Sequence, residues 1–155
     1  MNKTRQLTEV ATFAALYAVV TWLFAPISYF AVQFRVSEAL KPAIAKRREL
    51  AVAFMIGNFI GNIVSPFGGA GELLFMPVMN LIGGLVTFYV SRKNYWVASI
   101  MYGLIIAGSV SFMLYQFFNI PIVGSLPFLI VSELVVMLLG ASGYTLIDKR
   151  WKWWQ

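Results

Sequence analysis

The sequence predicts an all-α integral membrane protein with six transmembrane helices, and three observations support this fold class. Of the 155 residues, 60% are hydrophobic and 12% are charged, whereas charged residues make up about a quarter of a typical soluble domain. Apolar runs of the length that a bilayer requires alternate with short polar turns. The cations gather in alternate turns, as they do in helical membrane proteins. We expect residues 1–155 to form a single membrane domain.

The apolar runs and their interruptions define six expected helices. The first run is longer than the apolar core of a signal peptide, usually about 7–15 residues, so we interpret it as a spanning helix. Pro26 ends that helix. Pro42 interrupts the second helix, which is too short to cross a hydrocarbon core of about 30 Å. Neighbouring helices must shield it, or it begins in a re-entrant lid, and such spans mark binding sites in transporters. The expected helices comprise residues 8–24, 34–45, 50–64, 72–90, 95–118 and 126–147.

The distribution of Lys and Arg predicts that both termini are cytoplasmic. Two of these cations precede the first helix, three lie at 46–48, two at 92–93 and three in the C-terminal tail, which together are ten of the twelve. The opposite loops contain none. By the positive-inside rule, the cation-rich turns face the cytoplasm. The net charge of +6 therefore reflects membrane topology, and we expect no nucleic-acid partner.

Polar side chains gather in the expected outer half of the bilayer, and they predict an outward-facing binding pocket. Ionisable groups persist inside a membrane only where they face a polar interior and have partners. Arg35, Glu38 and Lys41 lie about one helical turn apart and could neutralise one another. Glu72 and Glu133 would still lack cations, so a cationic or hydrogen-bond-donating ligand would complete the site. The candidate substrate-binding residues are Tyr29, Gln33, Arg35, Glu38, Asn58, Asn62, Glu72 and Glu133.

Several kinds of chemistry are excluded by what the sequence lacks. The chain contains neither Cys nor His, which rules out metal sites built from those ligands. The Gly-rich turn at 68–71 is not followed by Lys and Ser or Thr, so it is not a phosphate loop. No nucleophile–base pair is evident. We therefore expect a protein without enzymatic activity, without a bound metal and without a cofactor.

Small residues on the first helix form two faces that permit close helix packing. Ala11 and Ala15 make one pair with small-xxx-small spacing, and Ala14 and Ala18 make another. The spacing allows two interpretations, which are packing against a helix of the same chain and docking to a partner subunit. The face that carries Asn58 and Asn62 is equally open, because amides there serve either ligand binding or hydrogen bonding between helices.

Residues 27–40, ISYFAVQFRVSEAL, resemble the signature of the queuosine-precursor transporter family. Weaker similarities lie in the run from Gly57 to Asn62 and in the last helix, from Ser132 and Glu133 to Gly140 and then Asp148-Lys149. Six spans with both ends inside, together with the Ala-xxx-Ala face, resemble the substrate-binding (S) subunits of energy-coupling factor (ECF) transporters. These transporters are importers of the ATP-binding-cassette (ABC) class.

The resemblance implies a ligand, partners and a location. The ligand would be a 7-deazaguanine, such as 7-aminomethyl-7-deazaguanine, 7-cyano-7-deazaguanine or queuine. The first helix would dock to a transmembrane coupling subunit that carries two cytoplasmic ATPase subunits, in the cell membrane of a prokaryote. ATP hydrolysis in those partners would reorient the loaded subunit and release the ligand inside.

The chemistry of a 7-deazaguanine suits the candidate residues. Glu38 or Glu133 would accept hydrogen bonds from N1–H and the N2 amine, and charge-assisted bonds of this kind are strong. Glu72 would pair with an aminomethyl ammonium, and Tyr29 or Phe30 would stack on the ring. The donors to the O6 carbonyl would be Arg35, Asn58 or Asn62. Two other functions stay open, which are a stand-alone carrier driven by an ion gradient and an S subunit for a different vitamin-like solute.

Overall fold

The computed structural model describes residues 2–29 and 34–155, and helices dominate both segments. No strand occurs among these described residues, so the all-α prediction is confirmed. The elements in chain order are α1 (Lys3–Leu23), α2 (Ala25–Ser28), the 3₁₀ helix η1 (Val36–Ala45), α3 (Leu50–Asn62), the π-helical turn η2 (Gly71–Phe75), α4 (Met76–Ser91), α5 (Tyr95–Phe118) and α6 (Ile122–Arg150).

Four helical segments are long and apolar enough to cross a membrane, which makes the chain a membrane protein by length and composition. They are Lys3–Leu23, Gly71–Ser91, Tyr95–Phe118 and Ile122–Arg150, where the second combines η2 with α4. The apolar helix Leu50–Asn62 is shorter. By this criterion the described residues contain four candidate spans, and the expected six are not reached because η1 and α3 are too short.

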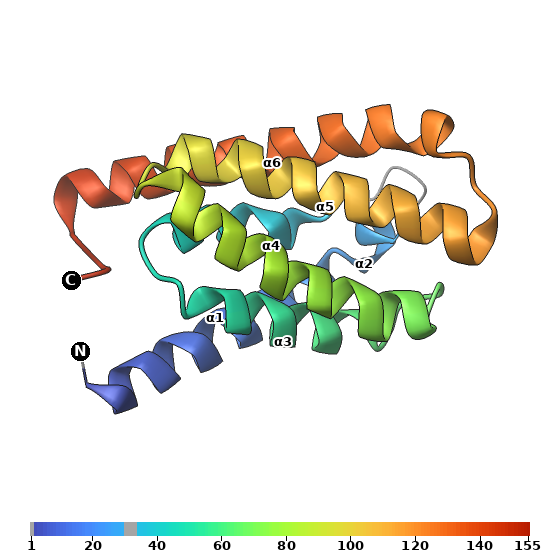
Figure 1. Ribbon diagram of the computed structural model, residues 1–155. Coiled ribbons are helices and arrows are strands. Elements are labelled where there is room, and N and C mark those ends of the chain that lie inside the picture. The colour runs from blue at the N-terminus through green and yellow to red at the C-terminus, as the bar shows by residue number, and fades with distance from the viewer. Residues whose placement is uncertain (1, 30–33) are drawn as a thin grey trace.

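The helices form an elongated bundle in which both chain ends lie at the same end (Figure 1). The short η1 lies among the longer helices and contacts α1, α4, α5 and α6. Most of its residues are buried, including Lys41 and the run from Pro42 to Ala45. The prediction that neighbouring helices shield this short segment is therefore confirmed. Residues 30–33 of the expected lid, which include Phe30 and Gln33, lie outside the described residues.

The second and the last expected helices differ from the sequence prediction. The second is a 3₁₀ helix, Val36–Ala45, and Pro42 lies inside it. The last helix begins at Ile122, four residues before the predicted start at 126. Asn119 ends α5 in a left-handed conformation with φ 55°, which Asn tolerates well. Only residues 119–121 therefore connect α5 to α6.

The seam between α1 and α3 depends on glycine. A Cβ atom added at Gly57 would lie 2.9 Å from the Ala14 carbonyl oxygen and 2.9 Å from Tyr17 Cβ. A Cβ atom at Gly61 would lie 3.3 Å from Thr21 Cβ. Since van der Waals contact is the main attraction between helices in lipid, these glycines let the two backbones approach closely. Gly57 and Gly61 have the Gly-xxx-Gly spacing that is typical of close helix packing.

Candidate functional site

Three buried carboxylates lie on three different elements. Glu38 lies on η1, Glu72 on η2 and Glu133 on α6, and their exposed fractions are 1%, 2% and 4%. Two buried cations accompany them, Arg35 at the start of η1 and Lys41 within it. The charges of Arg35, Glu38 and Lys41 act on Glu133, and the charge of Glu72 acts on Arg35. We call these five residues the polar cluster.

Both carboxylate oxygens of Glu38 already have partners within the protein. The Tyr17 hydroxyl donates a hydrogen bond to Glu38 Oε1. Lys41 Nζ forms an ion pair with Glu38 Oε2. The same ammonium lies 4.8 Å from the centroid of the Tyr102 ring, which is close enough for a cation–π interaction. Glu38 and Lys41 therefore neutralise each other, in agreement with the neutralisation expected from their spacing.

The side chains of Glu72 and Glu133 form no ion pair of this kind among the described residues. Within residues 2–29 and 34–155, the buried Oε2 atoms of Glu72 and Glu133 have no hydrogen-bond partner. A buried polar atom without a partner costs about 1–3 kcal/mol, and a charged one costs more. The two carboxyl groups are therefore the acceptors of the polar cluster that are free to receive donors from a ligand.

The two asparagines of α3 mainly hydrogen-bond within the protein. Asn62 Nδ2 donates to the Glu72 carbonyl oxygen over 3.0 Å and to Asn58 Oδ1 over 3.3 Å. Asn58 Nδ2 lies 3.5 Å from the Tyr17 hydroxyl. Asn62 Oδ1 is a buried acceptor without a partner among the described residues. Hydrogen bonding between helices thus explains most of the polar groups on this face, and it leaves the Asn62 Oδ1 acceptor unused.

Tyr29 and Arg35 form a second contact at the loop end of the cluster. The Arg35 guanidinium carbon lies 5.7 Å from the centroid of the Tyr29 ring. The Tyr29 hydroxyl donates to the Gly61 carbonyl oxygen at the end of α3. Burial raises the pKa of the Tyr29 phenol above its ordinary value, so the hydroxyl stays a donor at neutral pH. Gln33, the remaining candidate, lies outside the described residues.

A hollow of about 360 Å³ lies beside this loop end. Its described lining consists of Ala25, Pro26, Tyr29, Val64, Pro66 and Phe67. Tyr29 is the one candidate residue in that lining, and the three carboxylates do not contribute to it. The predicted outward-facing pocket for the carboxylates stays a prediction.

The four alanines of α1 divide between two surfaces. Ala14 and Ala18 are buried, with exposed fractions of 4% and 3%, and Ala14 packs against Gly57 of α3. They are therefore not free for a partner subunit, because the α1–α3 seam already covers them. Ala11 and Ala15 are exposed. Packing within the chain therefore describes Ala14 and Ala18. Ala11 and Ala15 are the pair that is available for docking.

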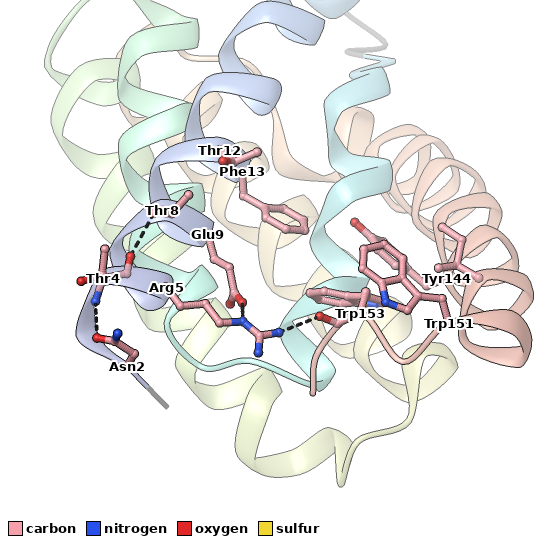
Figure 2. A pocket seen from close by; sticks show the side chains of 11 residues that line it. Asn2, Thr4, Arg5, Thr8, Glu9, Thr12, Phe13, Tyr144, Trp151 and Trp153 are labelled. Atoms are coloured by element: carbon pink, nitrogen blue, oxygen red, sulfur yellow. Dashed lines mark hydrogen bonds and ion pairs between the residues drawn. The ribbon is translucent and has the colours of Figure 1, made fainter.

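A larger hollow, of about 720 Å³, lies at the opposite end, where the chain termini meet. Figure 2 shows α1 on one side of it, with Thr8, Thr12 and Phe13, and the C-terminal tail with Trp153 across from them. Arg5 donates to the Gln155 carbonyl oxygen over 2.6 Å and to Glu9 over 3.0 Å. The tail is therefore hydrogen-bonded to the start of α1. The Trp residues of the tail do not by themselves predict this contact.

Sequence reasoning missed two tyrosines of the site. Tyr17 and Tyr102 are fully buried, and they hold the hydroxyl and the ring that contact Glu38 and Lys41. An aromatic residue inside an apolar helix is ordinary core material, so neither position carries a local signal.

No group of three or more metal-ligating acidic side chains occurs among the described residues.

The long apolar helices indicate a helical membrane protein, and buried ionisable residues in such proteins are typical of transporters. Residues 7–149 match the model of the family described as QueT transporter. The chain therefore belongs to the QueT transporter family, and the predicted membership in a queuosine-precursor transporter family is confirmed. Membership indicates transport rather than catalysis. No curated protein and no solved structure matches the chain.

Proposed function

We propose that this chain is the substrate-binding S subunit of an ECF importer and that it binds a 7-deazaguanine at the polar cluster. The observation that carries the proposal is the pair of buried carboxyl groups, Glu72 and Glu133, that lack hydrogen-bond partners among the described residues. A ligand rich in hydrogen-bond donors would supply what these two groups lack.

Glu133 is the preferred acceptor for the guanine-like edge of the ligand. The sequence left Glu38 and Glu133 as alternatives, but both oxygens of Glu38 are engaged by Tyr17 and Lys41. N1–H and the N2 amine present two parallel donors, which one carboxylate receives as a bidentate pair. Glu38 then serves to hold Lys41 and to shape the site.

The other candidates divide the rest of the ligand among them. Glu72 is proposed to pair with an ammonium substituent, because no ion pair with Glu72 occurs among the described residues. Arg35 and Asn58 supply donors for the O6 carbonyl, and Asn62 Oδ1 offers a further acceptor. Tyr29 stacks on or covers the ring, and Gln33 is proposed as a further ligand-binding residue.

The chain is proposed to cross the cell membrane of a prokaryote several times, with both ends in the cytoplasm. Support comes from the shared end at which both termini lie and from the cation-rich turns (Figure 1). The exposed Ala11–Ala15 face of α1 docks to the transmembrane coupling subunit, which carries two ATPase subunits. The polar cluster then faces the outside before docking.

Ligand retention and single substitutions test this function. Mass spectrometry of the purified chain should detect a bound 7-deazaguanine. Glu133→Gln should weaken binding of 7-aminomethyl-7-deazaguanine by about 30-fold or more, because breaking a buried charge-assisted pair costs about 2–5 kcal/mol. Glu49→Gln is the matched control, because Glu49 accepts a hydrogen bond from Gln6 near the N-terminus and contacts no residue of the polar cluster in any described hydrogen bond or ion pair. Unchanged affinity in Glu133→Gln would reject the assigned role.

Purification of the assembled transporter tests the partners. Co-purification of a coupling subunit with two ATPases is the expected result. Uptake by the chain alone, driven by a pH gradient, would instead establish the ion-coupled carrier and reject the S-subunit role.

A further inference from the structure

The buried face of α1 is hydrogen-bonded to η1 at two adjacent positions. The Tyr17 hydroxyl donates to the Glu38 carboxylate, and Thr21 Oγ1 lies 2.7 Å from Ser37 Oγ. Tyr17 and Thr21 are one helical turn apart, and Ser37 directly precedes Glu38. The four side chains are fully or almost fully buried. A movement of α1 at this level therefore changes its two hydrogen bonds to the part of η1 that carries Glu38.

The Tyr17 hydroxyl also connects α1 to α3. Asn58 Nδ2 lies 3.5 Å from that hydroxyl, and Gly57 allows close contact with Tyr17 Cβ. One side chain of α1 thus contacts polar groups of two other elements. Because protein interiors are close-packed, a shift of Tyr17 must be accommodated by Glu38, by Asn58 or by both.

The opposite face of the same helix is unoccupied in the described structure. Ala15 is exposed, whereas Tyr17, two residues later, is fully buried. Two residues correspond to about 200° of rotation around an α-helix, so these side chains leave α1 in nearly opposite directions. A partner on the Ala11–Ala15 face is separated from Glu38 by the thickness of one helix.

We propose that Tyr17 is a positioning residue that links partner docking on the Ala11–Ala15 face of α1 to ligand binding at the polar cluster, through its hydrogen bond to Glu38. The inference rests on the proposed function and adds a route by which the two events affect each other. A partner that shifts or rotates α1 changes the hydrogen bond from Tyr17 to Glu38 and the contact with Asn58. Linkage is reciprocal, so the ligand must change the affinity for the partner by the same factor.

Calorimetry with the complete transporter tests this link. The dissociation constant of 7-aminomethyl-7-deazaguanine is measured for the chain alone and for the nucleotide-free complex with the coupling subunit and ATPases. For the wild type we expect the two constants to differ by about fivefold or more, the lower end of typical allosteric coupling. In Tyr17→Phe, which keeps the ring and removes the hydroxyl, the ratio should fall close to one while both binding events persist.

Tyr144→Phe is the matched control. Its hydroxyl also donates to η1, to the Leu40 carbonyl oxygen over 3.2 Å, but it does so from α6 rather than from α1. This variant should keep the wild-type ratio. Thr21→Val, which removes the second contact without changing side-chain shape, should lower the ratio and covers the case in which Tyr17→Phe does not fold.

The outcomes separate this inference from the function on which it rests. A wild-type ratio that Tyr17→Phe and Thr21→Val both leave unchanged would overturn the link but not the S-subunit role. A wild-type ratio of one would also overturn the link and would leave the S-subunit role intact. A wild-type chain that binds neither the 7-deazaguanine nor the coupling subunit would overturn the proposed function, and this inference with it.

Discussion

Replacing Gly140 by Ala should force α6 away from η1, because the two elements are in backbone contact at this point. A Cβ atom at Gly140 would lie 2.1 Å from the Ala39 carbonyl oxygen and 2.8 Å from the Ala39 carbonyl carbon. Ordinary contacts between nonbonded heavy atoms are about 3.5–4.0 Å. The backbones must therefore separate by more than about 1 Å, and overpacking of this kind costs about 1–3 kcal/mol.

The consequence extends to the binding site, because Ala39 directly follows Glu38 in η1. Thermal unfolding of the purified protein should show a lower melting temperature for Gly140→Ala, and 7-aminomethyl-7-deazaguanine should bind more weakly. Gly143→Ala is the control in the same helix. A Cβ there meets no atom within 4 Å, and Ala stabilises a helix by up to about 1 kcal/mol relative to Gly. Equal stability of the two variants would refute the reasoning.

Three further predictions concern the ion pair, the topology and the tail. Lys41→Met should destabilise the fold by about 3–5 kcal/mol by leaving the Glu38 charge unpaired, and adding Glu38→Gln should restore part of that loss; greater instability of the double variant in thermal unfolding would contradict this. Because the chain lacks Cys, single Cys substitutions can report the topology. Lys93→Cys should react with an impermeant thiol reagent from the cytoplasmic side and Val123→Cys from the outer side, and labelling of both variants from the same side would reject the topology. Trp153→Ala should free the C-terminal tail and speed its proteolysis, since the Trp153 indole donates to the Tyr95 hydroxyl over 3.2 Å; an unchanged cleavage rate would show that the tail is held by other contacts.

The long helices could be predicted from the sequence because their apolar runs are continuous and their ends are marked. The predicted helix 95–118 agrees with α5, which begins after the capping residue Asn94 and ends at the left-handed Asn119. The sequence did not predict the early start of α6. Residues 122–125 include Gly124 and Ser125, which are residue types common in loops. The 3₁₀ geometry of η1 depends on packing inside the bundle, which no local pattern reports.

The charges of the candidate site and the Glu38–Lys41 ion pair were predictable from the sequence, but the contact between Glu38 and Tyr17 was not. Burial of Glu38, Glu72 and Glu133 follows from the cost of placing carboxylates in lipid, and the structure confirms that burial. The hydrogen bond from Tyr17 to Glu38 depends on a tertiary contact of α1, and an apolar helix gives no signal for the role of Tyr17. The division of the α1 alanines likewise depends on the position of α3, which spacing alone does not define.

Substrate titration of a variant that lacks both unpaired carboxylates tests the central claim most directly. In isothermal calorimetry, the wild-type chain should bind one equivalent of 7-aminomethyl-7-deazaguanine, and Glu72→Gln combined with Glu133→Gln should abolish the heat of binding while the melting temperature is retained. Binding by the double variant with wild-type affinity would contradict the claim that these two buried acids recognise the transported solute.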